Sequence, residues 1–400
     1  MICVIGGGEW QAPLISSIQK KGHQVLCVNL YSDTSGSQLA DFFEYADIKN
    51  KDQCFNAIKK YKDKIKAVVT DQSDIAVGTV AYISEKLGGL KSIGETTAKR
   101  FTDKYLMRVI CKELNLPNPS FCLVNNKLEV ENFIQKFGLP VVLKPRNSQS
   151  SKGISIITSN DQIESSLYNA MLESHEFDNV LIEQYIGGIE YTVEGYSRNF
   201  KNTTIAYSEK SHYEDCKQVA ESLTYPGNLS NNERLKLFKT CEMIVDSLGL
   251  KFGITHAEFK YHEGEFYLIE VAARGGGTKI SSHIVPTISN FNLYDILLDD
   301  LLKDNVNEFN YNYTENGVVR LKFLNFLSGK VLDCISVDKI IAHDRIIDFN
   351  YNFNIGEDIQ SVKDDRSRHA HLIVHYDNED NLNSNIKTIE DNIVNGIKYE

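Results

Sequence analysis

The chain has 400 residues, enough for two or three domains, and its 42% hydrophobic and 24% charged residues are typical of globular proteins. Its formal net charge of −11 argues against broad binding to nucleic acid or to membranes, because both favour a basic surface. We therefore expect no nucleic-acid partner and no membrane partner, and any phosphate site must be local.

The eight cysteines show no paired spacing, so neither a zinc cluster nor a disulfide framework is predicted. A reduced, cytoplasmic chain is the simplest expectation. The first residues, MICVIGGGEW, carry no basic leader, and their apolar run ends in glycines, which indicates a strand rather than a signal peptide.

Residues 1–95 alternate strands and helices in the order that builds a parallel sheet. Strands are expected at 2–6, 24–30 and 67–70, and helices at 11–21, 51–61 and 74–87. The turn GGGEW is only a fragment of the dinucleotide fingerprint, so it indicates a ligand crevice at the strand ends without naming a ligand. Asp74 either caps the helix that follows or contacts a substrate.

From residue 96 to 304, short strands and helices mix in the manner of an α+β domain. Helices are expected at 101–114, 128–137, 160–174 and 231–247, and strands at 121–124, 139–145, 154–158, 179–186, 189–197 and 203–210. An Asn-rich stretch at 305–316 is the expected linker. A third region, 317–400, combines short strands with an amphipathic terminal helix.

Two glutamates on one predicted hairpin are the most informative feature. Strands 254–261 and 266–272 flank HEGE, and a three-residue loop centred on Gly264 sets Glu258 opposite Glu270. Like charges opposed across a sheet destabilise it, so a cation should lie between them. Carboxylates used one or two at a time, with phosphate supplying further ligands, are typical of Mg²⁺ sites. The alternative is a solvent-exposed hairpin whose charged side chains simply face solvent.

Cationic and glycine-containing segments accompany this hairpin. Arg274 and the three glycines 275–277 follow the second strand and combine a fixed charge with a backbone that approaches anions closely. Lys144 ends an apolar strand, and the turn RNSQSSKG after it would offer amides and hydroxyls to phosphate oxygens. Taken alone, a Ser-rich turn with one lysine is more often an ordinary surface loop.

The segment LIEQYIGGIEY offers a further ligand contact. Glu183 ends an apolar strand, Tyr185 and Ile186 form an extended connector, and Glu190 begins the next strand. Free amides in such a connector would pair with an adenine edge, and Glu190 would accept ribose hydroxyls. The alternative is a tight strand connection with exposed glutamates. His256 lies on the same strand face as Glu258 and is a candidate to support it.

In order and spacing, this set resembles the ATP-grasp superfamily of carboxylate–amine ligases. The resemblance implies that Lys104 and Lys144 bind the ATP phosphates, with Lys144 and Arg274 catalytic. It further assigns these groups: Ser150, Ser151, Lys152 and Gly153 to a covering loop; Glu183, Tyr185 and Ile186 to adenine; Glu190 to ribose; Glu258 and Glu270 to Mg²⁺.

The implied fold is ATP-grasp, α/β and α+β. Its parts would be an N-terminal Rossmann-like parallel-sheet (pre-ATP-grasp) domain at 1–95, the nucleotide-binding domain at 96–304 and a small C-terminal α+β domain at 317–400. The implied cofactors are ATP and Mg²⁺, and the implied partners are a small carboxylate, an amine and, as a further candidate, a second copy of the chain in a homodimer.

The implied activity is ADP-forming joining of an acid to an amine. Ala272 stands where the family's metal motif has asparagine, as in the purine-pathway members, so a second Mg²⁺ would have one ligand fewer. That replacement keeps a bicarbonate-using carboxylase as the alternative. A non-catalytic nucleotide-binding module is the alternative of another class, and the intact acidic pair argues against it.

Overall fold

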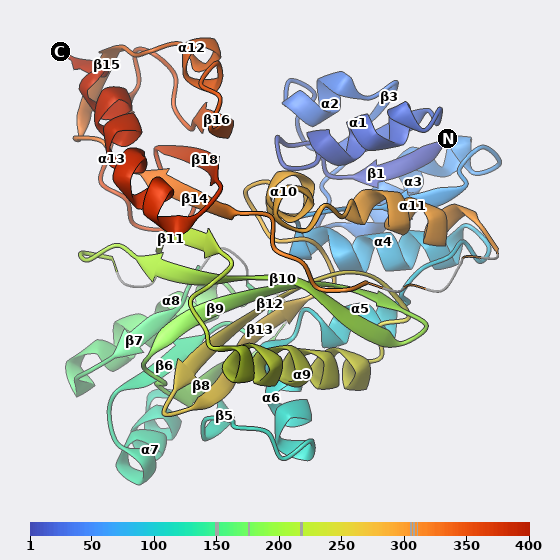
Figure 1. Ribbon diagram of the computed structural model, residues 1–400. Coiled ribbons are helices and arrows are strands. Elements are labelled where there is room, and N and C mark those ends of the chain that lie inside the picture. Colours follow the sequence, from blue (N-terminus) through green and yellow to red (C-terminus); the bar gives the residue numbers. More distant parts are fainter. Residues whose placement is uncertain (149–151, 175–176, 217–218, 305, 307–308, 310) are drawn as a thin grey trace.

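The computed structural model describes residues 1–148, 152–174, 177–216, 219–304, 306, 309 and 311–400 (Figure 1). Parallel and antiparallel sheets are both present, so the expected α/β and α+β class is confirmed. The eight cysteines, all of them described, are free thiols. Among the described residues, no helix combines the length and apolar character needed to cross a membrane.

The amino-terminal region is a parallel sheet covered by helices, as predicted. It contains β1 (Ile2–Ile5), α1 (Ala12–Lys20), β2 (Val25–Asn29), α2 (Ser35–Leu39), β3 (Phe42–Tyr45), α3 (Lys51–Ile58), a 3-10 turn (Lys59–Tyr61), β4 (Ala67–Val69) and α4 (Asp74–Lys86). The strand order is β3-β2-β1-β4. The strands β1, β2 and β4 are buried along their whole length and, except for Asn29 at the end of β2, are apolar, as parallel strands with both faces covered usually are.

The central region holds two antiparallel sheets. Its elements are α5 (Glu95–Arg100), α6 (Lys104–Glu113), β5 (Phe121–Val124), α7 (Lys127–Phe137), β6 (Val141–Lys144), β7 (Ser155–Ile157), a 3-10 turn (Asn160–Gln162), α8 (Ile163–Leu172), β8 (Val180–Gln184), β9 (Ile189–Arg198), β10 (Lys201–His212), β11 (Ala220–Tyr225), α9 (Asn231–Leu248), β12 (Phe252–His262), β13 (Glu265–Ala272), a π-helical turn (Ile280–Ile284), α10 (Val285–Ser289) and α11 (Leu293–Leu302).

The last region extends the larger of these sheets. It contains β14 (Val318–Leu324), β15 (Gly329–Asp333), α12 (Val337–Ile341), β16 (Ile346–Tyr351), β17 (Asp358–Ile359), β18 (Ala370–Tyr376), α13 (Glu379–Asn395) and β19 (Lys398–Tyr399). Because β14 pairs with β11, one eight-stranded sheet runs in the order β13-β12-β9-β10-β11-β14-β18-β16. The smaller central sheet has the order β5-β8-β6-β7, and β17, β15 and β19 form a third small sheet.

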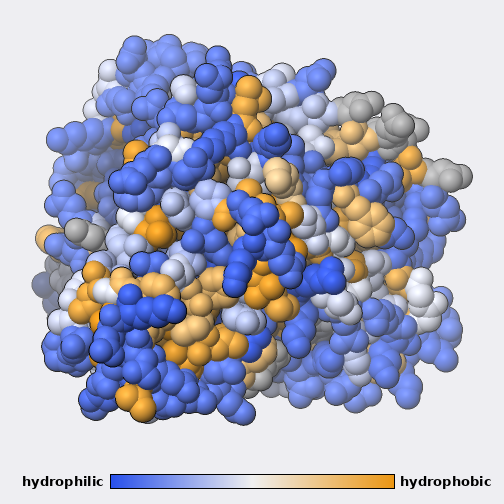
Figure 2. All heavy atoms as spheres, turned by 90° about the horizontal axis from the view of Figure 1, so that it is seen from below, coloured by the Kyte–Doolittle hydropathy of each residue, from blue (hydrophilic) through white to orange (hydrophobic). Residues whose placement is uncertain are grey.

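Both faces of the eight-stranded sheet are covered. Helices α6 and α9 pack on one face through a core that includes Met107, Leu237 and Phe259. The amino-terminal region and α11 pack on the other, where Leu14, Tyr196 and Leu298 share a core (Figure 1). The outer face seen in Figure 2 is mainly hydrophilic, with hydrophobic residues in separate groups.

Helix α9 has a defined cap at each end. Ser230 and Glu233 form a reciprocal capping box, with the Ser230 amide 2.9 Å from the Glu233 carboxylate. Gly249 ends the helix in the left-handed region, at φ 78°. This anchored helix carries the core that supports the central strands of the large sheet.

Asp71, at the end of β4, joins the amino-terminal region to the segment that follows β13. It is completely buried and accepts hydrogen bonds from the Gly275 amide (2.8 Å) and from the hydroxyls of Ser281 (2.7 Å) and Tyr294 (2.6 Å). A Cβ at position 275 would lie 2.4 Å from Ser281 Oγ, so glycine is required for this close approach.

We expect Asp71→Asn to lower the free energy of unfolding by about 1–3 kcal/mol, because one accepting oxygen becomes a donor that faces other donors. Tyr294→Phe, which removes a single donor, should cost less. Thermal and denaturant unfolding of both variants check the order. Equal stability of Asp71→Asn and the parent chain would show that the carboxylate does not stabilise the contact between the amino-terminal region and the segment after β13.

Candidate functional site

A cavity of about 520 Å³ opens between the eight-stranded sheet and the smaller β5-β8-β6-β7 sheet. Eight residues predicted from the sequence line it: Lys104, Lys144, Glu183, Tyr185, Ile186, Glu190, Glu258 and Glu270. Lys152, Gly153 and Arg274 are not among its lining residues. Ser150 and Ser151 lie outside the described residues.

The hairpin β12–β13 pairs Glu258 with Glu270, as predicted, although its loop is not the one expected. The loop is a two-residue turn in which Glu263 (φ 48°) and Gly264 (φ 82°) both have positive φ. Such a turn alone would place Glu258 opposite Ile269. A β-bulge between the Glu258 and Phe259 pairs shifts the register by one residue and restores the acidic pair.

Two lysines are the cations that accompany the acidic pair. Lys104 Nζ lies 2.8 Å from Glu270 Oε2, and Lys210 Nζ lies 3.0 Å from Glu258 Oε1. Burial raises the pKa of the Glu258 carboxyl, but Lys210 and His256 outweigh it and hold that pKa well below its usual value. Each of the two carboxylates is therefore compensated by a lysine of the chain itself.

Glu190 is held between cations on both neighbouring strands. In the sheet register it lies opposite Lys210 on one side and Lys260 on the other. Its carboxylate pairs with Lys210, with Lys260 Nζ at 3.1 Å and with His212 Nε2 at 3.3 Å. Against the effect of burial, these partners lower the pKa of Glu190 to about 2. Glu190 and Glu258 thus share the Lys210 ammonium.

The chain's acidic groups fit a magnesium ion held jointly with a ligand. Among the described residues, no three His, Cys, Asp or Glu side chains converge to hold a metal by themselves. The pair Glu258 and Glu270 supplies two hard oxygen donors on one cavity wall. Mg²⁺ is commonly bound by one or two carboxylates with phosphate and water completing the shell, and this donor set matches that pattern.

Glu183 organises a buried ionic triad with Arg108 and Lys144. Its carboxylate lies 2.7 Å from Arg108 Nε and 2.6 Å from Lys144 Nζ. Burial would raise the pKa of Glu183, but the two cations lower it to about 2. Burial, together with the Arg108 charge, lowers the pKa of Lys144 to about 8 despite Glu183. The side chain of Glu183 therefore orients Lys144, and it is paired with these two cations rather than free to contact an adenine ring.

The connector after Glu183 is only partly available for hydrogen bonding. The Tyr185 amide donates to the Pro140 carbonyl at 3.2 Å, so it is not one of the free amides expected there. Ile186 and the Tyr185 side chain line the cavity. Lys104 reaches the predicted covering loop, because its Nζ lies 2.7 Å from the Ser148 carbonyl.

Arg274 lies in the seam between β13 and the amino-terminal region. Its Nε donates to Asp74 at 2.9 Å, and its Nη1 donates to the Gly275 carbonyl at 2.8 Å. Burial opposes the charge, but Asp74 and then Glu270 raise the pKa of Arg274 above its usual value. The N-cap of α4 is Ser73, so the capping interpretation of Asp74 is wrong, and its carboxylate instead holds Arg274.

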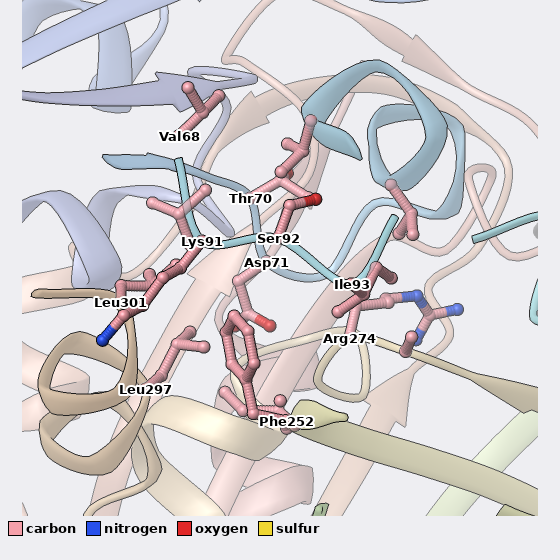
Figure 3. A pocket seen from close by; sticks show the side chains of 16 residues that line it. Val68, Thr70, Asp71, Lys91, Ser92, Ile93, Phe252, Arg274, Leu297 and Leu301 are labelled. Atoms are coloured by element: carbon pink, nitrogen blue, oxygen red, sulfur yellow. The ribbon is translucent and has the colours of Figure 1, made fainter. Parts of the chain in front are cut away.

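A second, smaller cavity of about 60 Å³ lies beside Arg274 (Figure 3). Thr70, Asp71 and Ser92 contribute polar atoms, while Phe252 and Leu297 contribute apolar surface from the central region. The volume admits a few waters at most. It is a gap in the domain seam rather than a site for an organic ligand.

Sequence reasoning missed two cations at the centre of the site. Arg108 stands four residues after Lys104 on the same face of α6 and is 2% exposed. Arginines are rarely buried to this extent unless they are paired with an acidic residue, here Glu183. Lys210 lies within β10 at the end of the predicted strand, just as Lys144 ends β6. A charged residue on the buried side of a predicted element was the available signal in both cases.

Comparison with known proteins identifies the central region. Residues 137–283 match the ATP-grasp domain family. Formate-dependent phosphoribosylglycinamide formyltransferase from Trichormus variabilis is 23% identical over 297 residues, which cover 73% of this chain and 74% of that protein.

Solved structures share the fold over almost the whole chain. The L-amino acid ligase from Bacillus licheniformis has a TM-score of 0.85 and 17% identity, covering 100% of this chain and 98% of its own. N5-carboxyaminoimidazole synthetase from Staphylococcus aureus, solved with ADP, has a TM-score of 0.73 and 16% identity, covering 97% and 96%. Residues 137–283 therefore match the ATP-grasp domain family, and the fold of almost the whole chain is that of these ligase and synthetase structures.

Proposed function

We propose that this protein is an ATP- and Mg²⁺-dependent ligase that activates a carboxylate as an acyl phosphate and joins it to an amine, with release of ADP and phosphate. The opposed carboxylates of Glu258 and Glu270, in one cavity with Lys104, Lys144 and Lys210, carry the proposal. A volume of about 520 Å³ lies within the range of small-molecule sites, roughly 300–1,000 Å³.

The similar proteins support this class of reaction. One acts with formate and another is a ligase of L-amino acids, and both formate and amino acids are carboxylic acids. The ADP-bound synthetase supports a nucleotide in the matching fold. None of these names identifies the acid or the amine that this chain would use.

The cavity residues divide the proposed work. Lys104 and Lys144 would hold the phosphates, with the loop that includes Lys152 and Gly153 above them. The connector 183–186 would meet adenine, and Glu190 would accept the ribose hydroxyls in exchange for one of its cations. Bound by Glu258 and Glu270, Mg²⁺ would neutralise phosphate charge during transfer.

Two steps account for the products. A carboxylate oxygen of the acid bonds to the γ-phosphorus, and the bond from that phosphorus to the bridging oxygen breaks to release ADP. The amine nitrogen then bonds to the acyl carbon, phosphate leaves and the nitrogen loses a proton. Arg274 would stabilise the transferred group, and the lysines lower the barrier by fixed, positioned charge rather than by covalent chemistry.

Product analysis tests the proposal. ADP release should require both an acid and an amine, should proceed in buffer stripped of bicarbonate, and should yield a product with the mass of the two partners less one water. A panel of carboxylic acids against a panel of amines identifies the pair. If ADP release needs bicarbonate and no condensed product forms, the enzyme is a carboxylase and the ligase proposal fails.

We expect Glu258→Gln and Glu270→Gln each to lower Mg²⁺-dependent turnover at least roughly 100-fold, because each removes a charge placed at the transferred group. Glu265→Gln on the exposed end of the same hairpin is the matched control and should keep parental activity. Near-normal turnover in either cavity variant would remove the metal assignment.

Lys144 makes ATP binding depend on pH. Since the pKa of Lys144 is about 8, the phosphate-facing charge is complete below that pH and is lost above it, so KM for ATP should rise as the pH passes 8. Lys144→Arg should flatten this rise, and Lys144→Ala should lose about 2–4 kcal/mol of transition-state stabilisation. Exposed Lys112→Ala is the control. An unchanged kcat/KM for ATP in Lys144→Ala would make Lys144 purely structural.

A further inference from the structure

A buried hydrogen-bonded chain leads from the middle of the large sheet to Glu258. Glu194, on β9, is 0% exposed and accepts from the Tyr225 hydroxyl at 3.1 Å. His256, on β12, lies with Nδ1 2.8 Å from Glu194 Oε1 and with Nε2 3.4 Å from Glu258 Oε1. The imidazole ring therefore stands between a fully buried carboxylate and the carboxylate proposed to bind Mg²⁺.

The buried carboxylate of Glu194 lowers the stability of the fold unless its interaction with His256 compensates. Its Oε2 is buried without a hydrogen-bond partner among the described residues, and the only ionic partner that the structure gives it is His256. Buried carboxylates without full hydrogen bonding lower stability. Each ring nitrogen faces a carboxylate oxygen, Nδ1 that of Glu194 and Nε2 that of Glu258, which fixes the orientation of the ring.

The glycine segment that follows Arg274 passes directly over this ring. A Cβ at Gly276 would lie 2.9 Å from His256 Nδ1 and 2.9 Å from Ile280 Cδ1. Glycine at 276 therefore allows the segment 275–277 and the imidazole ring to occupy adjoining space. A side chain at position 276 would therefore crowd the ring.

We propose that His256, held by Glu194, is a positioning residue that sets the Glu258 carboxylate for the metal and couples it to the glycine segment 275–277. The proposal rests on the proposed function, because it concerns the same nucleotide–metal site. The competing explanation is a buried ion pair that only stabilises the pairing of β9 with β12. Metal affinity separates the two, since a purely stabilising pair would leave it unchanged.

Two substitutions divide the contacts of the ring. The amide nitrogen of asparagine reproduces Nδ1, so His256→Asn keeps the bond to Glu194 and loses the contact to Glu258. The amide of glutamine extends to the place of Nε2, so His256→Gln keeps the contact to Glu258. His262→Asn, on the half-exposed end of the same strand, is the matched control.

The measurement is Mn²⁺ binding to the full chain with saturating ADP, followed by electron paramagnetic resonance, beside ADP binding in EDTA. For His256→Asn we expect the Kd for Mn²⁺ to rise roughly tenfold or more, with metal-free ADP affinity within about twofold of the parent. His256→Gln should retain most of the Mn²⁺ affinity, and His262→Asn all of it.

Parental Mn²⁺ affinity in His256→Asn would overturn the proposal, and so would equal losses in the Asn and Gln variants, since packing alone would then explain both. If His256→Asn does not fold, Gly276→Ala tests the same coupling, because its added Cβ crowds the ring; unchanged Mn²⁺ affinity there would count against the proposal. Failure of the parent chain itself to bind Mn²⁺ with ADP would overturn the proposed function as well.

Discussion

Charge compensation inside the cavity is the constraint on which the site depends. Four glutamates line the one cavity, at positions 183, 190, 258 and 270. Each is paired with a cation from another element: Arg108 and Lys104 from α6, Lys144 from β6 and Lys210 from β10. Burying unpaired carboxylates would cost several kcal/mol each, so the cations are needed for the fold as much as for a ligand.

The same compensation leaves the site ready for an anionic ligand. A nucleotide phosphate is negative and its metal ion is positive. The phosphate can therefore replace a glutamate as the partner of a lysine, and the metal ion can replace a lysine as the partner of a glutamate. Against the effect of burial, the neighbouring glutamates raise the pKa of Lys210 above its usual value, whereas burial lowers the pKa of Lys144 to about 8. Preorganised charge of this kind lowers the reorganisation that accompanies transfer.

Most helices and strands were predictable because the residues that specify them are neighbours in the sequence. The apolar strands predicted at 2–6 and 24–30, observed as β1 and β2, depend on neighbouring residues alone. The strand β3 was missed because its residues are half-exposed and carry no clear alternation. The turn of the acidic hairpin was mispredicted because Glu263 adopts a left-handed conformation that is unusual for glutamate.

Eight of the residues predicted from the sequence line the cavity, but their ionic pairings were not predicted. Glu258 opposite Glu270 was predicted correctly, but through a wider loop, since a bulge is not visible in the sequence. The contacts of Lys210 with Glu190 and Glu258 depend on the register of three strands that lie far apart in the chain. Register of that kind is set by packing across the sheet, so no local pattern reveals it.

The continuity of the eight-stranded sheet limits how this molecule can move. Backbone hydrogen bonds between β11 and β14 tie the last region to the central one, so the two cannot swing apart as rigid bodies without breaking a ladder. The β5-β8-β6-β7 sheet shares no strand pairing with the large sheet in the described residues. A hinge motion of that small sheet would therefore break no strand pairing, and it would carry Lys144 and Glu183 away from the strands that hold Glu258 and Glu270.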